Sequence, residues 1–184
     1  MQITGLDPAS RLTGWATSSG DIPLAGVWPM KQCGDDLGMM VDLFDQFLSI
    51  HIDRFHPDVF VVEGPILIVN HHPKAGNRPT DTPGKLRKLY GLNSHIQFVA
   101  KRRGIIYQEE TLQALKRELT GKSNGEKAEM VRVARRIGIE LPDGPGEEDA
   151  ADGVAACLIG IRRYVPLSSR RFDQLIHGRR GALL

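Results

Sequence analysis

The chain opens with Ile3-Thr4-Gly5-Leu6-Asp7-Pro8-Ala9-Ser10, and the other elements can be arranged around this segment. Its apolar residues predict a first strand over residues 2–7. The strand ends on a carboxylate, Asp7, and the proline that follows cannot continue the hydrogen-bond ladder of a sheet. The sequence therefore predicts an acidic side chain at the end of the first strand.

Three further acids lie far from this segment in the sequence. Glu63 follows the apolar run 59–62, and Asp149 and Asp152 belong to Glu148-Asp149-Ala150-Ala151-Asp152. If these acids converge on Asp7, their like charges are unfavourable unless divalent cations lie between them. Mg²⁺ prefers carboxylate oxygen, and two such ions can activate a water and stabilise a leaving oxygen in phosphodiester hydrolysis. We therefore expect Asp7 to bridge two ions, with Glu63 on one and Asp149 and Asp152 on the other.

Each acid also has an ordinary structural interpretation. Asp7 could be a turn residue before proline, and Glu63 could be a surface acid at a strand end. Asp149 and Asp152 could be first-turn acids favoured by a helix dipole. The four together favour the metal site.

The hydrophobic pattern predicts a mixed α/β order. Strands are expected at 2–7, 14–17, 24–28, 59–62 and 105–107. Helices are expected at 38–55, from Pro83 to Gly104, from Thr111 to Gly121, from a Ser123–Glu126 capping box to Gly138, and at 147–164. The fold class is thus α/β, with a mixed five-stranded sheet covered by helices on both faces. The first and fourth strands are predicted to be parallel neighbours, which would place Asp7 beside Glu63.

Composition indicates one globular domain. The chain has 184 residues, 41% of them apolar, and a net charge of +2. No segment approaches the length of a membrane span, no signal peptide is recognisable, and two distant cysteines suggest reduced thiols, so we expect a cytoplasmic protein without membrane contact.

Charge is unevenly distributed along the sequence. Residues 116–136 carry seven Lys or Arg against three Glu, and residues 140–152 carry six acids and no base. From residue 162 to the end there are six Arg against one Asp. An acidic cluster framed by basic segments suits a nuclease acting on a polyanion, although solvated helix faces would explain any one segment. Lys116, Arg117, Lys122 and Lys127 are the candidate DNA-binding residues.

Several of these motifs resemble the RuvC family of Holliday-junction resolvases. The opening segment with Thr13-Gly14 is similar to the start of that family, and Val61-Val62-Glu63 resembles its second acidic position. The strongest similarity runs from Ala114 to Leu158. It includes Leu115-Lys116, Gly121, Glu126-Lys127, Met130-Val131 and Asp149-Ala150-Ala151-Asp152.

The resemblance implies an RNase H-like fold over residues 1–165, followed by an Arg-rich tail at 166–184. It further implies a homodimer, Mg²⁺ or Mn²⁺ as cofactor, and paired nicking of four-way DNA junctions in a bacterial cytoplasm. Lys116 and Lys127 would then lie near the scissile phosphate or its flanking backbone. A symmetric junction requires two active sites, which also favours a dimer.

Two features depart from the family pattern. Ile66 stands where the family has an aromatic residue implicated in junction recognition, and the loop at 70–82 is longer. Stacking on an unpaired base therefore lacks its usual platform. These departures concern junction selectivity more than hydrolysis, and they are compatible with a phage origin.

Three other functions are compatible with these residues. They are a general nuclease that debranches DNA, an RNase H-type enzyme that cleaves RNA, and a non-catalytic junction-binding protein. A sugar-kinase or actin-like fold would need a second lobe and a much longer chain.

Overall fold

The computed structural model describes residues 1–65, 83–166, 172 and 176. Eleven elements follow one another along this part of the chain: β1 Ile3–Asp7, β2 Leu12–Thr17, β3 Leu24–Pro29, a 3₁₀ helix η1 at Lys31–Cys33, α1 Leu37–Phe55, β4 Val59–Glu63, α2 Pro83–Arg103, β5 Ile106–Glu110, α3 Leu112–Thr120, α4 Lys127–Arg136 and α5 Glu147–Tyr164.

The strands form one mixed sheet in the order β3-β2-β1-β4-β5. The first three strands make an antiparallel meander, in which Trp15 of β2 lies opposite Gly26 of β3. Strand β4 pairs in parallel with β1, Leu6 lying opposite Val62, and β5 extends the parallel part. The predicted five-stranded mixed sheet, with its first and fourth strands as parallel neighbours, is therefore confirmed.

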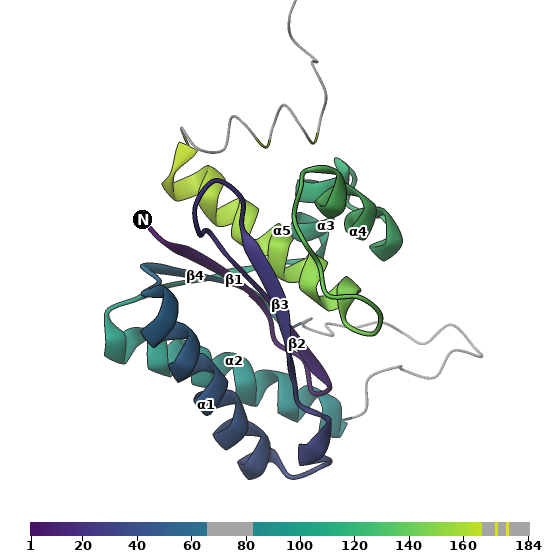
Figure 1. The fold of residues 1–184 in the computed structure, drawn as a ribbon. Coiled ribbons are helices and arrows are strands. Elements are labelled where there is room, and N and C mark those ends of the chain that lie inside the picture. The colour runs from purple at the N-terminus through teal and green to yellow at the C-terminus, as the bar shows by residue number, and fades with distance from the viewer. Residues whose placement is uncertain (66–82, 167–171, 173–175, 177–184) are drawn as a thin grey trace, which may run out of the picture.

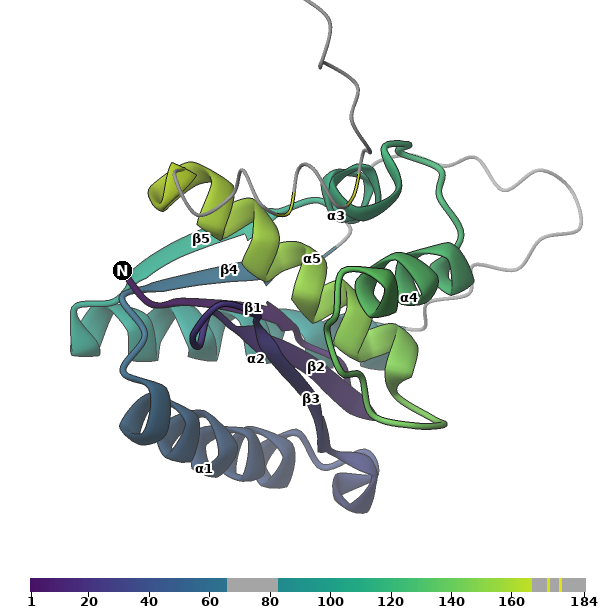
Figure 2. The ribbon, with the colours of Figure 1, turned by 45° about the horizontal axis from the view of Figure 1, so that its top comes forward.

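Helices cover both faces of this sheet, as predicted (Figure 1). Leu6, Phe60 and Val62 point to the face that packs against α1 and α2. Ile3 and Val61 point to the opposite face, which packs against α3, α4 and α5. Because side chains alternate along a strand, the continuously apolar β4 supplies both cores at once. Figure 2 shows the two helical layers on either side of the sheet.

Helix α5 lies unusually close to the sheet. A Cβ atom added at Gly5 would overlap the main chain of Gly153 and Cys157, and one added at Gly14 would overlap the carbonyl group of Asp149. On the helix side, a Cβ atom at Gly153 would lie 2.8 Å from the backbone of Trp15. The missing side chains on both surfaces allow the helix backbone to approach strands β1 and β2.

Several boundaries differ from the sequence prediction: β2 begins two residues early, at Leu12, and β3 ends one residue late, at Pro29. Two further differences have a clear physical cause. Strand β5 runs three residues beyond the predicted 105–107, to Glu110, because its pairing with β4 continues as far as Glu63. The Ser123–Glu126 capping box was wrong, since α4 begins at Lys127 with Glu126 as its N-cap and without a side-chain cap. The hydroxyl of Thr120 accepts a hydrogen bond from the Lys122 amide and donates to the Lys116 carbonyl, so the preceding residues form a turn.

Other predictions fall partly outside the described residues. Ile66, the loop at 70–82 and the arginines beyond Pro166 belong to the part of the chain that the structure does not describe. Within the predicted tail, Phe172 and Ile176 are buried in the core beside α5. Cys33 and Cys157 are buried free thiols. Among the helices of residues 1–65 and 83–166, none combines the length and apolar character of a membrane span.

The close approach of α5 predicts a specific sensitivity at Gly14. The Gly14→Ala protein should lose about 3 kcal/mol of unfolding free energy, because the new methyl group must displace the Asp149 backbone. Thermal unfolding followed by circular dichroism would measure the loss as a fall of several degrees in Tm. Gly84→Ala is the matched control, since a Cβ atom there meets no neighbour within 4 Å. Equal Tm values for the two variants would contradict this account of the helix–sheet contact.

Candidate active site

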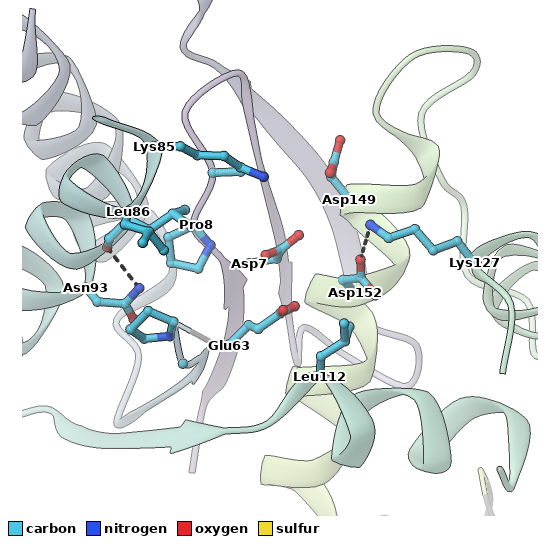
Figure 3. A pocket seen from close by; sticks show the side chains of 14 residues that line it. Asp7, Pro8, Glu63, Lys85, Leu86, Asn93, Leu112, Lys127, Asp149 and Asp152 are labelled. Atoms are coloured by element: carbon cyan, nitrogen blue, oxygen red, sulfur yellow. Dashed lines mark hydrogen bonds and ion pairs between the residues drawn. The ribbon is translucent and has the colours of Figure 1, made fainter. Parts of the chain in front are cut away.

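Two of the predicted acids lie at the ends of adjacent parallel strands. Asp7 is the last residue of β1, and Glu63 is the last residue of β4. The register pairs Leu6 with Val62, so the two carboxylates come next in line at the same edge of the sheet. Figure 3 shows both side chains projecting into one pocket.

Helix α5 adds the third member of the cluster. One carboxylate oxygen from each of Asp7, Glu63 and Asp152 lies within 4.8 Å of the other two. The Asp152 side chain is only 1% exposed, because it faces the sheet where α5 approaches most closely. Residues 145 positions apart in sequence therefore present oxygen ligands to one point.

Asp149 is positioned differently from the other three acids. It lines the same pocket from the first turn of α5 but stands outside the tight group of three. Its side chain is half-buried, and Figure 3 shows it one turn away from Asp152 along the helix. The predicted set of four thus consists of a close triad and one more peripheral carboxylate.

Burial makes ionisation of these acids unfavourable. It is the largest cause of the raised pKa of Asp7, and the charges of Glu63 and Asp152 raise that pKa further. Burial and then the Asp152 charge raise the pKa of Glu63 to about 7. The pKa values of Asp149 and Asp152 are also raised, chiefly by burial. Without a cation the cluster therefore favours retention of protons near neutral pH.

Lys127 supplies part of the missing positive charge. Its Nζ atom donates to Oδ2 of Asp152 at 2.8 Å. Burial alone would lower the pKa of Lys127, but the ion pair with Asp152 outweighs it and holds that pKa above its usual range. One lysine is shared among several carboxylates, so it compensates the cluster only in part.

The donor set fits a hard metal ion. Asp152 Oδ1 is buried and has no hydrogen-bond partner among the described residues, although Oδ2 of the same carboxylate is paired. A buried oxygen left in this way is unfavourable unless a ligand completes it. The carboxylates of Asp7, Glu63 and Asp152 together form an acidic group that could bind a divalent cation.

The pocket also contains residues that the sequence analysis missed. Its volume is about 210 Å³, and α2 contributes a second wall with Lys85, Leu86, Leu89 and Asn93. Leu112 closes the side next to α3. No local motif marks these residues, because they reach the acids only through the packing of α2 on the opposite face of the sheet.

The four predicted DNA-binding residues separate into two groups. Lys127 lines the pocket, and Lys116 lies close enough for its charge to oppose the upward pKa shifts that burial causes in Glu63 and Asp152. The Lys122 side chain is 68% exposed, and its Nζ atom lies 4.0 Å from Oε1 of Glu129. Arg117 borders a different hollow, beside Glu118 and Arg162. The structure brings the first two to the acids and leaves the other two outside the pocket.

The mixed sheet with helices on both faces is an RNase H-like fold, and solved structures of the same fold bear this out. The RuvC structure from Thermus thermophilus matches 92% of this chain and 98% of its own, with a TM-score of 0.64 and 17% identity. The same protein in complex with a Holliday junction substrate has a TM-score of 0.62 and 13% identity over 92% of this chain and 97% of its own. The yeast mitochondrial Holliday junction resolvase Ydc2 has a TM-score of 0.56 at 14% identity, over 97% and 81%.

Curated proteins of similar sequence include several RuvC proteins. The crossover junction endodeoxyribonuclease RuvC of Akkermansia muciniphila is 25% identical over 179 residues, which are 95% of this chain and 98% of the relative. The RuvC of Colwellia psychrerythraea is 26% identical over 162 residues, covering 85% and 84%. No protein-family model matches the chain. The relatives confirm the predicted resemblance to RuvC, and the similarity extends along nearly the full length of the chain.

The raised pKa of Glu63 predicts a measurable stability effect. In EDTA at pH 8, Glu63→Gln should stabilise the folded protein by at most about 3 kcal/mol, because it removes a buried charge that repels its neighbours. Because the pKa of Glu63 is raised in the folded protein, the penalty is fully present above about pH 7 and disappears as the pH falls to 4.5, the ordinary pKa of a glutamate. The Tm advantage of the variant should therefore vanish at pH 4.5.

In Mg²⁺ the wild type should have the higher Tm of the two, because the ion stabilises the protein that retains all its ligands. Glu140→Gln, at an exposed site away from the pocket, is the matched control and should leave Tm unchanged at both pH values. A lower Tm for Glu63→Gln in EDTA at pH 8 would mean that Glu63 has a structural role instead.

Proposed function

We propose that this protein is a metal-dependent, structure-selective DNA endonuclease that cleaves four-way junctions by paired phosphodiester hydrolysis. The observation that carries the proposal is the convergence of Asp7, Glu63 and Asp152 within 4.8 Å. This cluster occurs in a chain whose relatives are named crossover junction endodeoxyribonucleases. DNA recombination and repair are the processes to which such an activity belongs.

The acids are proposed to hold two Mg²⁺ ions, which Mn²⁺ can replace. Asp7 lies centrally and would contact both, Glu63 would hold one, and Asp149 and Asp152 would hold the other. Bound divalent ions supply Lewis-acid polarisation of the phosphate and a nucleophilic water. The protein's own contribution is a rigid frame, because two strands and one helix set the carboxylate positions before substrate arrives.

Lys127 is proposed to change partners when metal and DNA bind. In the free protein its Nζ atom pairs with Asp152, 2.8 Å away. A divalent ion on Asp152 would compete with that ion pair, and the lysine would then be available to a phosphate oxygen beside the acids. Lys116 is proposed to act on the same side, while Lys122 and Arg117 would contact DNA further from the cut.

The assembly and the extent of the domain are likewise proposals. Cutting both sides of a symmetric junction calls for a homodimer that acts on DNA in the cytoplasm. The nuclease domain would comprise residues 1–165, and the Arg-rich segment 166–184 would add positive charge. Phe172 and Ile176 pack on the domain, and the carbonyl of Ile176 accepts a hydrogen bond from Arg136 at 3.1 Å, so part of this segment is attached to it.

A second candidate is a general nuclease that debranches DNA. The sequence favours it at one position, Ile66, where the family has an aromatic residue. An aliphatic side chain provides a poorer stacking surface for an unpaired base, so the crossover itself would be recognised less selectively.

A cleavage assay with Mg²⁺ tests the proposal directly. Labelled synthetic DNA would be offered as a four-way junction, a three-way junction, a flap and a linear duplex, with Asp7→Asn as the control. We expect paired symmetric nicks in the four-way junction and loss of cleavage in the variant, with binding to branched DNA retained. Cleavage of every branched form would support the debranching nuclease. Cleavage near the wild-type rate by Asp7→Asn would remove Asp7 from the metal site.

The role of Lys127 generates a separate prediction. Lys127→Ala should reduce the single-turnover cleavage rate about a hundredfold, the usual effect of losing one preorganised charge at a reacting phosphate. With the protein in saturating excess, so that weaker DNA binding does not limit the rate, Lys122→Ala removes the same charge from an exposed site on the turn before α4 and should leave the rate nearly unchanged. Equal losses in the two variants would indicate a general electrostatic effect of the basic segment.

A further inference from the structure

The α2 wall of the pocket has no part in the function described so far. Lys85, in the first turns of α2, lines the pocket together with Leu86 and Leu89. Figure 3 shows its side chain extending from α2 toward the space above Asp7. The wall therefore brings a positive charge to the acids from a helix that contributes no carboxylate.

Lys85 and Lys127 lie on opposite sides of the acid cluster (Figure 3). Lys85 belongs to the helical layer of α1 and α2, and Lys127 belongs to the layer of α4 and α5. The pocket thus has one lysine on its α2 side and one on its α4 side, with Asp7, Glu63 and Asp152 between them. A chain of phosphates that crosses the pocket from α4 to α2 would pass both lysines.

The electrostatics of a DNA strand make both lysines useful. Metal ions on the acids would neutralise the scissile phosphate, but the phosphates on either side remain charged and close to carboxylates. A cation is needed for each flanking phosphate, and lysine serves as a compact point charge for this purpose. The apolar side chains of Leu86 and Leu89 beside Lys85 lower the local polarity and strengthen such a contact.

The other lysines of α2 near Lys85 do not line the pocket. Lys88 lies one turn further along and donates to Asp35 Oδ1 and to the Gly34 carbonyl, both at 2.7 Å. That lysine therefore joins α2 to the segment before α1. Lys101 is exposed at the far end of α2, about 24 Å along the helix axis.

We propose that Lys85 binds the phosphate next to the scissile one, on the α2 side of the acid cluster. The proposal rests on the proposed nuclease function and adds a contact that fixes where the cleaved strand lies. The strand would run from Lys127 and Lys116, on the side of α3 and α4, over the acids to Lys85 on the side of α2. Lys85 is thus a positioning residue that sets the register of the strand over the acids.

The test uses four-way junctions in which a single phosphate near the cut is replaced by an uncharged methylphosphonate. Binding is measured in Ca²⁺, and cleavage is measured in Mg²⁺. The proteins are wild type, Lys85→Ala, Lys85→Arg and the matched control Lys101→Ala. Binding reports on Lys85 whether or not the protein turns over, whereas cleavage by the wild type reports on the proposed function.

We expect Lys85→Ala to weaken binding about tenfold and to reduce the slope of log Kd against log salt by about one. One methylphosphonate position that weakens wild-type binding should have no further effect in Lys85→Ala, because its partner is already missing. Lys85→Arg should restore that sensitivity, and Lys101→Ala should match wild type. If Lys85→Ala keeps the wild-type response at every position, or behaves like Lys101→Ala, the proposal is overturned.

Discussion

The backbone contact between α5 and strands β1 and β2 positions the candidate site. The contact leaves no room for a side chain at Gly5 and Gly14 on the sheet, or at Gly153 on the helix. Small alanines on both sides of Gly153 allow the same close approach. Asp152 can reach Asp7 only because the helix lies this close. The same contact buries Asp152, so the geometry that brings the carboxylates together also removes them from water.

Burial of the acids produces a conflict between stability and function. Asp7, Glu63 and Asp152 all have raised pKa values, with burial as the largest cause. The rest of the fold must offset this cost, and it does so through two apolar cores that share the central strands. A site of this kind is preorganised for a cation, because the repulsion that destabilises the free protein is relieved when the cation binds.

Three lysines surround the acid cluster, and they differ in how directly they contact it. Lys127 pairs directly with Asp152, Lys116 influences the acids from a greater distance, and Lys85 approaches from the opposite helical layer. The three lysines come from α4, α3 and α2, so the basic border of the pocket draws on both faces of the sheet. In the proposed complex, this border would give a phosphate chain a path over the acids.

Local patterns in the sequence were sufficient for much of this description. The period of the apolar residues predicted the element order, and the helical connection between β1 and β4 predicted their parallel pairing, which places Asp7 beside Glu63. Tertiary structure alone decided that Asp152 joins the triad while Asp149 stands aside, that Arg117 borders a different hollow, and that Lys85 enters the pocket. Periodicity depends on neighbours along the chain, whereas these positions depend on how closely α2 and α5 pack against strands distant from them in sequence. The failed capping box at Ser123 has a local cause instead, because hydrogen bonds between the Thr120 hydroxyl and Lys122 hold that segment in a turn.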